Sequence, residues 1–121
     1  MEVLVLHHNN RDNSFDHVAT VDATCEISDA QDYAEAVKWA LEYAYRLTQN
    51  IEGSWSRERV LEIDGELIEN PDWNKHVTTV MPLEIYNGEE YGHRSSMMGD
   101  RMIIDGKTFE VDFFGFKELC D

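Results

Sequence analysis

The clearest periodic pattern along the chain lies between Ala30 and Gln49, where apolar side chains recur at steps of three and four residues. This spacing places them on one side of an α-helix, and further alanines and tyrosines widen the apolar stripe. The segment Ser28-Asp29-Ala30-Gln31 has the form of a capping box, which predicts that the helix begins there. We expect one long amphipathic helix, and the breadth of its stripe predicts that it packs against a sheet.

Strand patterns occupy most of the remaining sequence. Residues 17–23 alternate between polar and apolar side chains and follow an apolar segment at residues 1–6, so both segments are predicted strands. Three later dipeptides favour tight hairpin turns: Asp64-Gly65, Asn87-Gly88 and Asp105-Gly106. Pro82 marks an edge or a bulge in the strand expected over residues 76–86. The pattern predicts a single α+β domain over residues 1–121, with the helix packed on an antiparallel sheet of about five strands with hairpins.

The composition adds one unusual property, a large negative charge. The chain carries 25 Asp and Glu against 10 Lys and Arg, which gives a formal net charge of -15 at pH 7. This charge disfavours direct binding to nucleic acids or to anionic membranes and favours a basic partner. Spread over the roughly 6,700 Å² that a compact protein of this mass exposes, the charge is about fourfold more dilute than on a DNA duplex. Mimicry of DNA therefore requires the carboxylates to be clustered.

Familiar catalytic and metal-binding motifs are missing from the sequence. Cys25 and Cys120 lack the spacing of a zinc or redox motif, which favours a reduced cytoplasm as the location. The five histidines form no helical His-x-x-x-His pair, and the adjacent His7 and His8 are expected on opposite faces of a strand. There is no P-loop, no nucleophile elbow, no signal peptide and no apolar run that could span a bilayer. We expect a soluble protein that is not an enzyme and uses no metal or cofactor.

Two segments carry motifs that go beyond generic patterning. Residues 45–55 read Tyr-Arg-Leu-Thr-Gln-Asn-Ile-Glu-Gly-Ser-Trp, and residues 93–100 read His-Arg-Ser-Ser-Met-Met-Gly-Asp, followed by a hairpin and Gly115-Phe116. Together they resemble a group of small bacteriophage and conjugative-plasmid proteins with a Leu-Thr-x-x-Ile-x-x-x-Trp helix end and an Arg-Ser-x-x-x-Gly-Asp turn before a Gly-Phe tail. The second motif is also similar to a YodL-like segment found among plasmid anti-restriction genes. The resemblance implies a mobile-element origin and a role against host defence, with no reaction attached.

Residues 56–92, between the two motifs, have no counterpart in that group, so we expect the function particular to this protein to lie there. The leading hypothesis is a non-enzymatic acidic protein that binds and inhibits a basic host protein, such as a nucleic-acid-handling or defence enzyme, with partial DNA mimicry as one form of the mechanism. Opposite charge on the partner speeds association. The predicted partner-binding carboxylates are Glu62, Asp64, Glu66, Glu69, Asp72, Glu84, Glu89 and Glu90. The competing interpretation is a solvated acidic surface that only maintains solubility.

The Arg-Ser turn supports an alternative hypothesis, a small-molecule or nucleotide-binding module. A guanidinium, two hydroxyls and N–H groups freed by glycine can receive an anion, and an indole can stack on a base. The residues of this predicted ligand site are Trp55, Arg94, Ser95, Ser96 and Asp100. In the opposing structural interpretation, Arg94 pairs with a carboxylate, Asp100 accepts backbone N–H groups and Trp55 covers the end of the helix. A virion component and a homodimer are further alternatives that the sequence leaves open.

Overall fold

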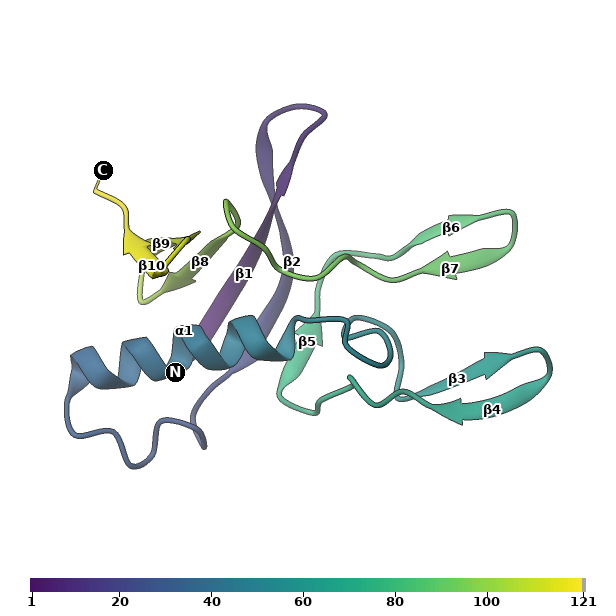
Figure 1. Ribbon diagram of the computed structural model, residues 1–121, viewed down its shortest axis with the longest axis horizontal. Helices are drawn as coiled ribbons and strands as arrows, with labels where there is room; N and C mark the ends of the chain where they lie inside the picture. The colour runs from purple at the N-terminus through teal and green to yellow at the C-terminus, as the bar shows by residue number, and fades with distance from the viewer. Residues whose placement is uncertain (121) are drawn as a thin grey trace.

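A six-stranded antiparallel sheet forms the centre of the computed structural model, which describes residues 1–120 (Figure 1). The strands of this sheet are β1 (Glu2–Asn9), β2 (Ser14–Asp22), β5 (Val77–Thr79), β8 (Arg101–Ile104), β9 (Lys107–Asp112) and β10 (Gly115–Glu118). They lie side by side in the order β10-β9-β8-β1-β2-β5. The strand β1 pairs with β2 along its whole length and with β8 on its other side, so the N-terminal hairpin is the middle of the sheet.

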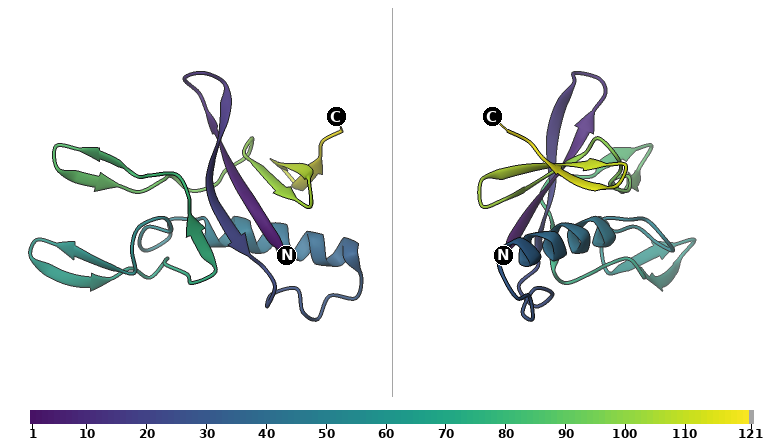
Figure 2. Two further views of the ribbon diagram at one scale, coloured as in Figure 1. Left: turned by 180° about the vertical axis from the view of Figure 1, so that it is seen from behind. Right: turned by 60° about the vertical axis from the view of Figure 1, so that its left-hand side comes forward.

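One helix, α1, spans Tyr33–Leu47 and lies across one face of the sheet (Figures 1 and 2). Its buried stripe agrees with the predicted periodicity and consists of Ala36, Val37, Ala40, Leu41 and Ala44. The predicted start at Ser28 is wrong by about one turn. Asp32 accepts the N–H of Glu35 at 2.8 Å and is the N-cap instead, while the Glu35 carboxylate accepts the N–H of Gln31. No helix among the described residues has the length and apolar character needed to cross a membrane.

The hydrophobic core lies between α1 and the sheet. Its fully buried members come from α1, β1, β2 and β8 and include Val3, Val5, Val21, Ala40, Ala44, Met102 and Ile104. Trp55, which is 2% exposed, joins this core from the loop after α1. The α+β class is confirmed, and the main sheet has six strands where the sequence predicts about five.

Two hairpins that were expected within the sheet lie outside it. The first joins β3 to β4 and the second joins β6 to β7, and we call residues 60–69 and 84–91 the first and second acidic arms. Their strands are β3 (Val60–Ile63), β4 (Glu66–Glu69), β6 (Glu84–Tyr86) and β7 (Glu89–Tyr91). All four residues of the turns Asp64-Gly65 and Asn87-Gly88 have positive φ, as type I′ turns require. The strand predicted over residues 76–86 is wrong as one unit, because β5 and β6 are separate strands on either side of Pro82.

The arms make the molecule less compact than its mass predicts. Both project from the same end of the molecule, beyond the C-terminus of α1 (Figures 1 and 2). The chain exposes 8,052 Å², which exceeds the value for a compact monomer of this mass by about 1,300 Å². Two-stranded hairpins are only marginally stable in water without further packing, so the arms present an unpartnered surface.

Candidate functional site

Seven of the eight predicted partner-binding carboxylates lie on the acidic arms. These are Glu62, Asp64, Glu66 and Glu69 on the first arm and Glu84, Glu89 and Glu90 on the second arm. All seven residues are exposed, and neither arm contains a Lys or Arg. The fold therefore gathers most of the predicted acids at one end of the molecule, on two projecting ribbons.

Exposed apolar side chains accompany these acids on both arms. Leu67 on the first arm is 78% exposed, and Ile85 on the second arm is 72% exposed. Other large apolar residues exposed on the arms are Val60, Ile63, Ile68, Tyr86 and Tyr91. The cross-strand register places Leu67 opposite Glu62 and Ile85 opposite Glu90, so each apolar side chain shares a face with a carboxylate. The sequence-based hypothesis considered only the charges, although the mixture of acids and apolar residues in both arms was the available signal.

Asp72 is the predicted partner-binding acid that lies apart from the arms. One of its carboxylate oxygens accepts the N–H groups of residues 51–53 at 2.7, 3.0 and 2.8 Å. Beside it, the buried Asn70 accepts the N–H of Ser54 at 2.9 Å. Successive N–H groups that converge on one anion form a nest. Asp72 therefore fixes the loop that follows α1, and we leave it out of the arm surface.

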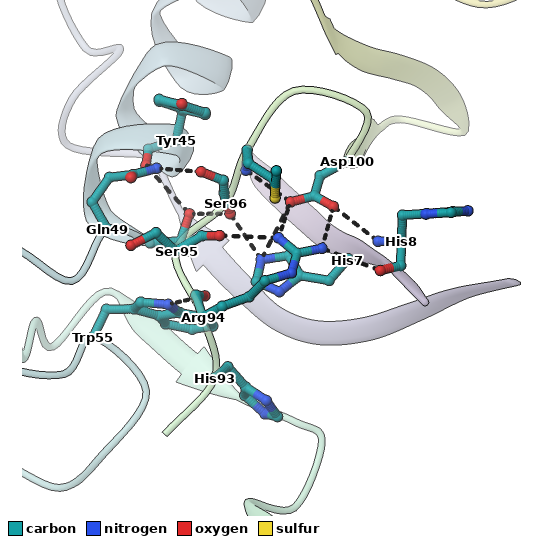
Figure 3. Close-up of polar contacts among 12 residues, drawn as sticks. His7, His8, Tyr45, Gln49, Trp55, His93, Arg94, Ser95, Ser96 and Asp100 are labelled. Carbon is teal, nitrogen blue, oxygen red and sulfur yellow. Dashed lines mark hydrogen bonds and ion pairs between the residues drawn. The ribbon is translucent and has the colours of Figure 1, made fainter. Parts of the chain in front are cut away.

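The predicted ligand site forms an internal polar network around Arg94 (Figure 3). The guanidinium of Arg94 and the carboxylate of Asp100 make a bidentate pair, with Nη1–Oδ2 and Nη2–Oδ1 distances of 2.6 and 2.7 Å. Arg94 also donates to the carbonyl oxygens of Ser95 and His8. Because a guanidinium has five N–H donors, only Nε–H is left for a ligand. This geometry agrees with the structural interpretation, in which Arg94 pairs with a carboxylate. It differs from an open anion-binding site.

Asp100 is fully buried at the centre of this network. It accepts the N–H groups of His8 and Met97, both at 2.8 Å. Burial by itself raises the pKa of the Asp100 carboxyl, but the hydrogen bonds from Arg94 and from the two N–H groups outweigh burial and hold this pKa below its usual value. The Asp100 carboxylate in turn raises the pKa of Arg94. The charged pair ties β1 to the turn that precedes β8.

His7 extends the network through two hydroxyl groups. Its Nε2 lies 3.0 Å from Ser96 Oγ, which lies 2.7 Å from Thr48 Oγ1. Burial lowers the pKa of His7 to about 4, and the nearby Asp100 offsets only part of this effect. In a catalytic triad the histidine binds the serine hydroxyl with one ring nitrogen and the aspartate with the other. Here the same Nε2 of His7 faces both the Ser96 hydroxyl and, at 3.9 Å, Asp100. Ser96 is also only 2% exposed, so its hydroxyl is closed to a substrate.

The two sequence motifs contact each other through the residues that follow α1. Gln49 donates to the carbonyl oxygen of Ser96 at 2.9 Å, and the Ser95 hydroxyl accepts an N–H from the same loop at 2.8 Å. The indole N–H of Trp55 donates to the carbonyl oxygen of Arg94 at 2.8 Å. These contacts join residues 39 to 47 positions apart in the chain, so spacing within either motif gives no sign of them. Trp55 thus holds the end of the helix against the Arg-Ser turn.

A cleft of about 460 Å³ lies beside this network, between the far end of the β1–β2 hairpin and the base of the second arm. Its lining includes His8, Arg11, Asp16, Glu84, Tyr91, His93 and the outer side of Arg94. Positive and negative side chains are balanced there, in contrast to the arms. The sequence-based hypothesis missed the cleft because only the fold brings its two walls together.

The histidines and cysteines of the described residues do not converge on a metal site. His7 is buried, whereas His8, on the other side of β1, places its Nε2 2.7 Å from Asn13 Oδ1. Cys25 and Cys120 are exposed free thiols. Within residues 1–120, no three His, Cys, Asp or Glu side chains converge in a way that could hold a metal ion.

The motifs that resemble phage and plasmid proteins meet in a single network, built around Arg94 and Asp100. Their proximity shows that both motifs serve one structural unit in this chain. The family assignment itself stays a prediction. Comparison with protein-family models, with curated proteins and with solved structures found no match to this chain.

Proposed function

We propose that this is a non-enzymatic phage or plasmid protein that binds a basic host protein through its acidic arms and inhibits it. The observation that carries the proposal is the pair of projecting arms, with seven exposed carboxylates and no basic residue. A nucleic-acid-handling or defence enzyme fits as the target, because such proteins carry Lys and Arg where they contact phosphate. The mobile-element origin rests on the sequence resemblance alone.

The apolar side chains of the arms favour binding over solubility as the role of this surface. A solvated acidic surface has no need of Leu67, Ile85 and Tyr86, which are 78, 72 and 66% exposed. Exposed apolar groups among polar ones are typical of protein interaction sites. A partner that covers these side chains would also supply the packing that two-stranded hairpins lack.

The arms fit a mixed protein interface better than a close imitation of DNA. On the first arm, Glu62 and Glu69 share one face of the ribbon while Glu66 lies on the other face. Aliphatic side chains separate these acids, so they form no row comparable to a DNA strand, which carries one phosphate per ~3.4 Å. DNA mimicry in this protein is therefore limited to the negative field of the arms.

Affinity purification from host cells with matched variants tests the proposal. The arm variant replaces the three glutamates of the second arm (E84Q/E89Q/E90Q), and the control variant replaces three exposed acids elsewhere (E2Q/E26Q/D29N). Both variants lose the same charge. We expect the wild type and the control to retain the same host protein, and the arm variant to lose most of it.

The retained host protein is then tested in purified form. Its binding to nucleic acid should fall when the wild-type protein is added, and the complex of the two proteins should weaken as salt screens the charges. Equal recovery by the arm variant would contradict a role for the arms. A binding constant that does not change with ionic strength would contradict the electrostatic mechanism.

The cleft beside Arg94 favours a second candidate function, a small-molecule or nucleotide-binding module. A thermal-shift assay with a nucleotide panel tests it, because a ligand that binds only the folded state raises the Tm. Arg11 is exposed and lines the cleft outside the Arg94–Asp100 pair. R11A should therefore abolish any shift, while R46A on α1 should keep it. A panel without any shift would reject this candidate.

A further inference from the structure

The strand β10 is an edge of the main sheet, at the end of the molecule opposite to the acidic arms (Figures 1 and 2). Val111 of β9 makes its backbone hydrogen bonds on the β8 side. The backbone N–H and C=O groups of its neighbours Glu110 and Asp112 therefore point toward β10. Their partners in β10 are Gly115 and Lys117. Phe116 and Glu118 therefore direct their N–H and C=O groups out of the sheet, where β10 has no neighbouring strand.

An apolar groove of about 360 Å³ lies between this edge and α1. Val37 and Leu41 of α1 and Phe109 of β9 form part of its lining, and each of these residues is less than 10% exposed. The groove thus reaches the hydrophobic core from the side of the molecule, between α1 and the edge of the sheet. An apolar side chain placed here would be removed from water.

Two phenylalanines at the β9–β10 turn are exposed without a role in forming the turn. Phe113 is 75% exposed and Phe114 is 94% exposed, and their rings pack edge to face with centroids 4.9 Å apart. Turns favour Gly, Asn, Asp and Pro, and phenylalanine adds nothing to their geometry. Phe114 also lines the groove. The aromatic pair, the groove and the free backbone edge therefore form one continuous surface.

We propose that this surface binds an extended, cationic segment of another protein, which adds an antiparallel seventh strand beside β10. Backbone hydrogen bonds to Phe116 and Glu118 supply affinity, as in other cases of strand addition. The ring of Phe116 meets that of Tyr45 on α1. Side chains of the added strand that lie opposite Phe116 share this face and enter the groove. The site is separate from the arms, so the inference goes beyond the function proposed above.

Charge determines which kind of segment fits. Glu42 and Glu118 line the groove against a single cation, Lys38, and the whole chain carries -15. A second copy of the chain brings the same charge, so electrostatic repulsion opposes self-association at this edge. In a segment with Lys or Arg between its apolar residues, the apolar side chains fit the groove and the cations are attracted by the negative charge of the molecule.

Heteronuclear NMR of the full chain with a synthetic peptide tests the proposal. The probe is acetyl-Lys-Val-Lys-Val-Lys-Val-Lys-amide, and its control carries an N-methyl group on every valine, which removes the backbone donors and keeps the charges and side chains. At an ionic strength of about 0.15 M, the probe should shift the amide signals of Phe116 and Glu118. The control peptide should bind about tenfold more weakly, which corresponds to about 1.4 kcal/mol.

Variants of the protein locate the site. E118P removes an outward N–H group without breaking the ladder to β9, a position at which an edge strand tolerates proline, whereas E118Q keeps this N–H. We expect E118P and F114S to weaken binding of the probe about tenfold, E118Q to weaken it less, and the arm variant E84Q/E89Q/E90Q to leave it unchanged. Equal binding by the N-methylated peptide, or shifts confined to the arms, would overturn this proposal without affecting the function proposed for the arms.

Discussion

Arg94 acts as a structural residue because its guanidinium neutralises a carboxylate that water does not reach. Asp100 is fully buried, whereas the side chain of Arg94 is 40% exposed. Loss of the arginine leaves a charge inside the protein without its counter-ion. Loss of the carboxylate would also deprive the N–H groups of His8 and Met97 of their acceptor, so the arginine is the better position at which to measure the ion pair.

R94A is expected to lower the free energy of unfolding by about 3 kcal/mol, because it leaves the buried Asp100 without its counter-ion. R94K keeps the charge but loses the bidentate fork, so its loss should be smaller. Urea denaturation measures both changes. The matched control is R46A, whose ion pair with Glu26 is exposed and worth less than about 1 kcal/mol. If R94A cost no more than R46A, the structural role of the pair would be refuted.

The buried His7 predicts a specific dependence of stability on pH. Burial lowers its pKa from the ordinary 6.5 to about 4 in the folded protein, so between these values the unfolded chain binds a proton that the folded chain does not. Stability should therefore fall as the pH drops from 6.5 to 4, by up to about 3 kcal/mol. The lowered pKa of Asp100 acts in the same direction, but only below its ordinary value of 3.8.

Denaturation curves across this pH range separate His7 from the other histidines. H7Q should flatten the change in stability between pH 6.5 and 4, because it removes the group whose pKa differs between the folded and unfolded states. H17Q is the control, because it replaces an exposed histidine and keeps His7 in place, so the fall in stability should remain. A wild-type profile that is level in this range would mean that His7 is not held neutral by burial.

At the scale of the elements, local signals predicted which segments form but not where they lie. The turns at Asp64-Gly65 and Asn87-Gly88 formed as expected, yet the choice between joining the sheet and projecting from it depends on distant contacts. The strand β10 was missed because it follows Phe113 and Phe114, which carry no turn signal. The sequence predicts pairing of Arg94 with a nearby carboxylate as one of two interpretations. It does not predict the contacts between the Arg-Ser turn and the end of the helix, because these contacts join residues far apart in the sequence.

The second arm joins the rest of the molecule at Gly92, which packs against the hydroxyl groups of Ser54 and Ser56. A Cβ at this position would collide with Ser54 Oγ and lie 3.0 Å from Ser56 Oγ. The φ angle of Gly92 is not positive, so these contacts, and not the backbone conformation, oppose a side chain. G92A is therefore expected to push both hydroxyls aside and to weaken the 2.7 Å hydrogen bond from the N–H of His93 to Ser56 Oγ, which loosens the base of the arm.

Limited proteolysis within residues 84–91 measures this loosening, and G92A should be cleaved faster than the wild type. The double variant S54A/G92A is the matched control. Ser54 Oγ is buried and has no hydrogen-bond partner in the described chain, so its removal provides space without breaking a contact. Recovery of slow cleavage in the double variant would locate the effect at this contact, and unchanged cleavage of G92A would contradict it.

At the scale of the whole molecule, the arms and the β10 edge lie at opposite ends, with the main sheet and α1 between them (Figure 1). In the proposed function, the acids of the arms act over a distance, because a field of one sign attracts a basic partner before contact. The apolar side chains of the arms act only in contact. Charge and apolar area on the same ribbons should therefore control different steps of binding.

For the host protein that we propose as the partner of the arms, this division predicts separate effects on the two rate constants. Raising the ionic strength from about 0.05 to about 0.5 M should slow association at least about tenfold, because screening removes the steering. L67S and I85S keep the charge and should instead accelerate dissociation, the step through which contact residues usually act. Both side chains are more than 70% exposed, so the stability of the free protein should change by less than about 0.5 kcal/mol. Surface plasmon resonance resolves the two steps. Unchanged dissociation in both serine variants would mean that the arms act through their charge alone.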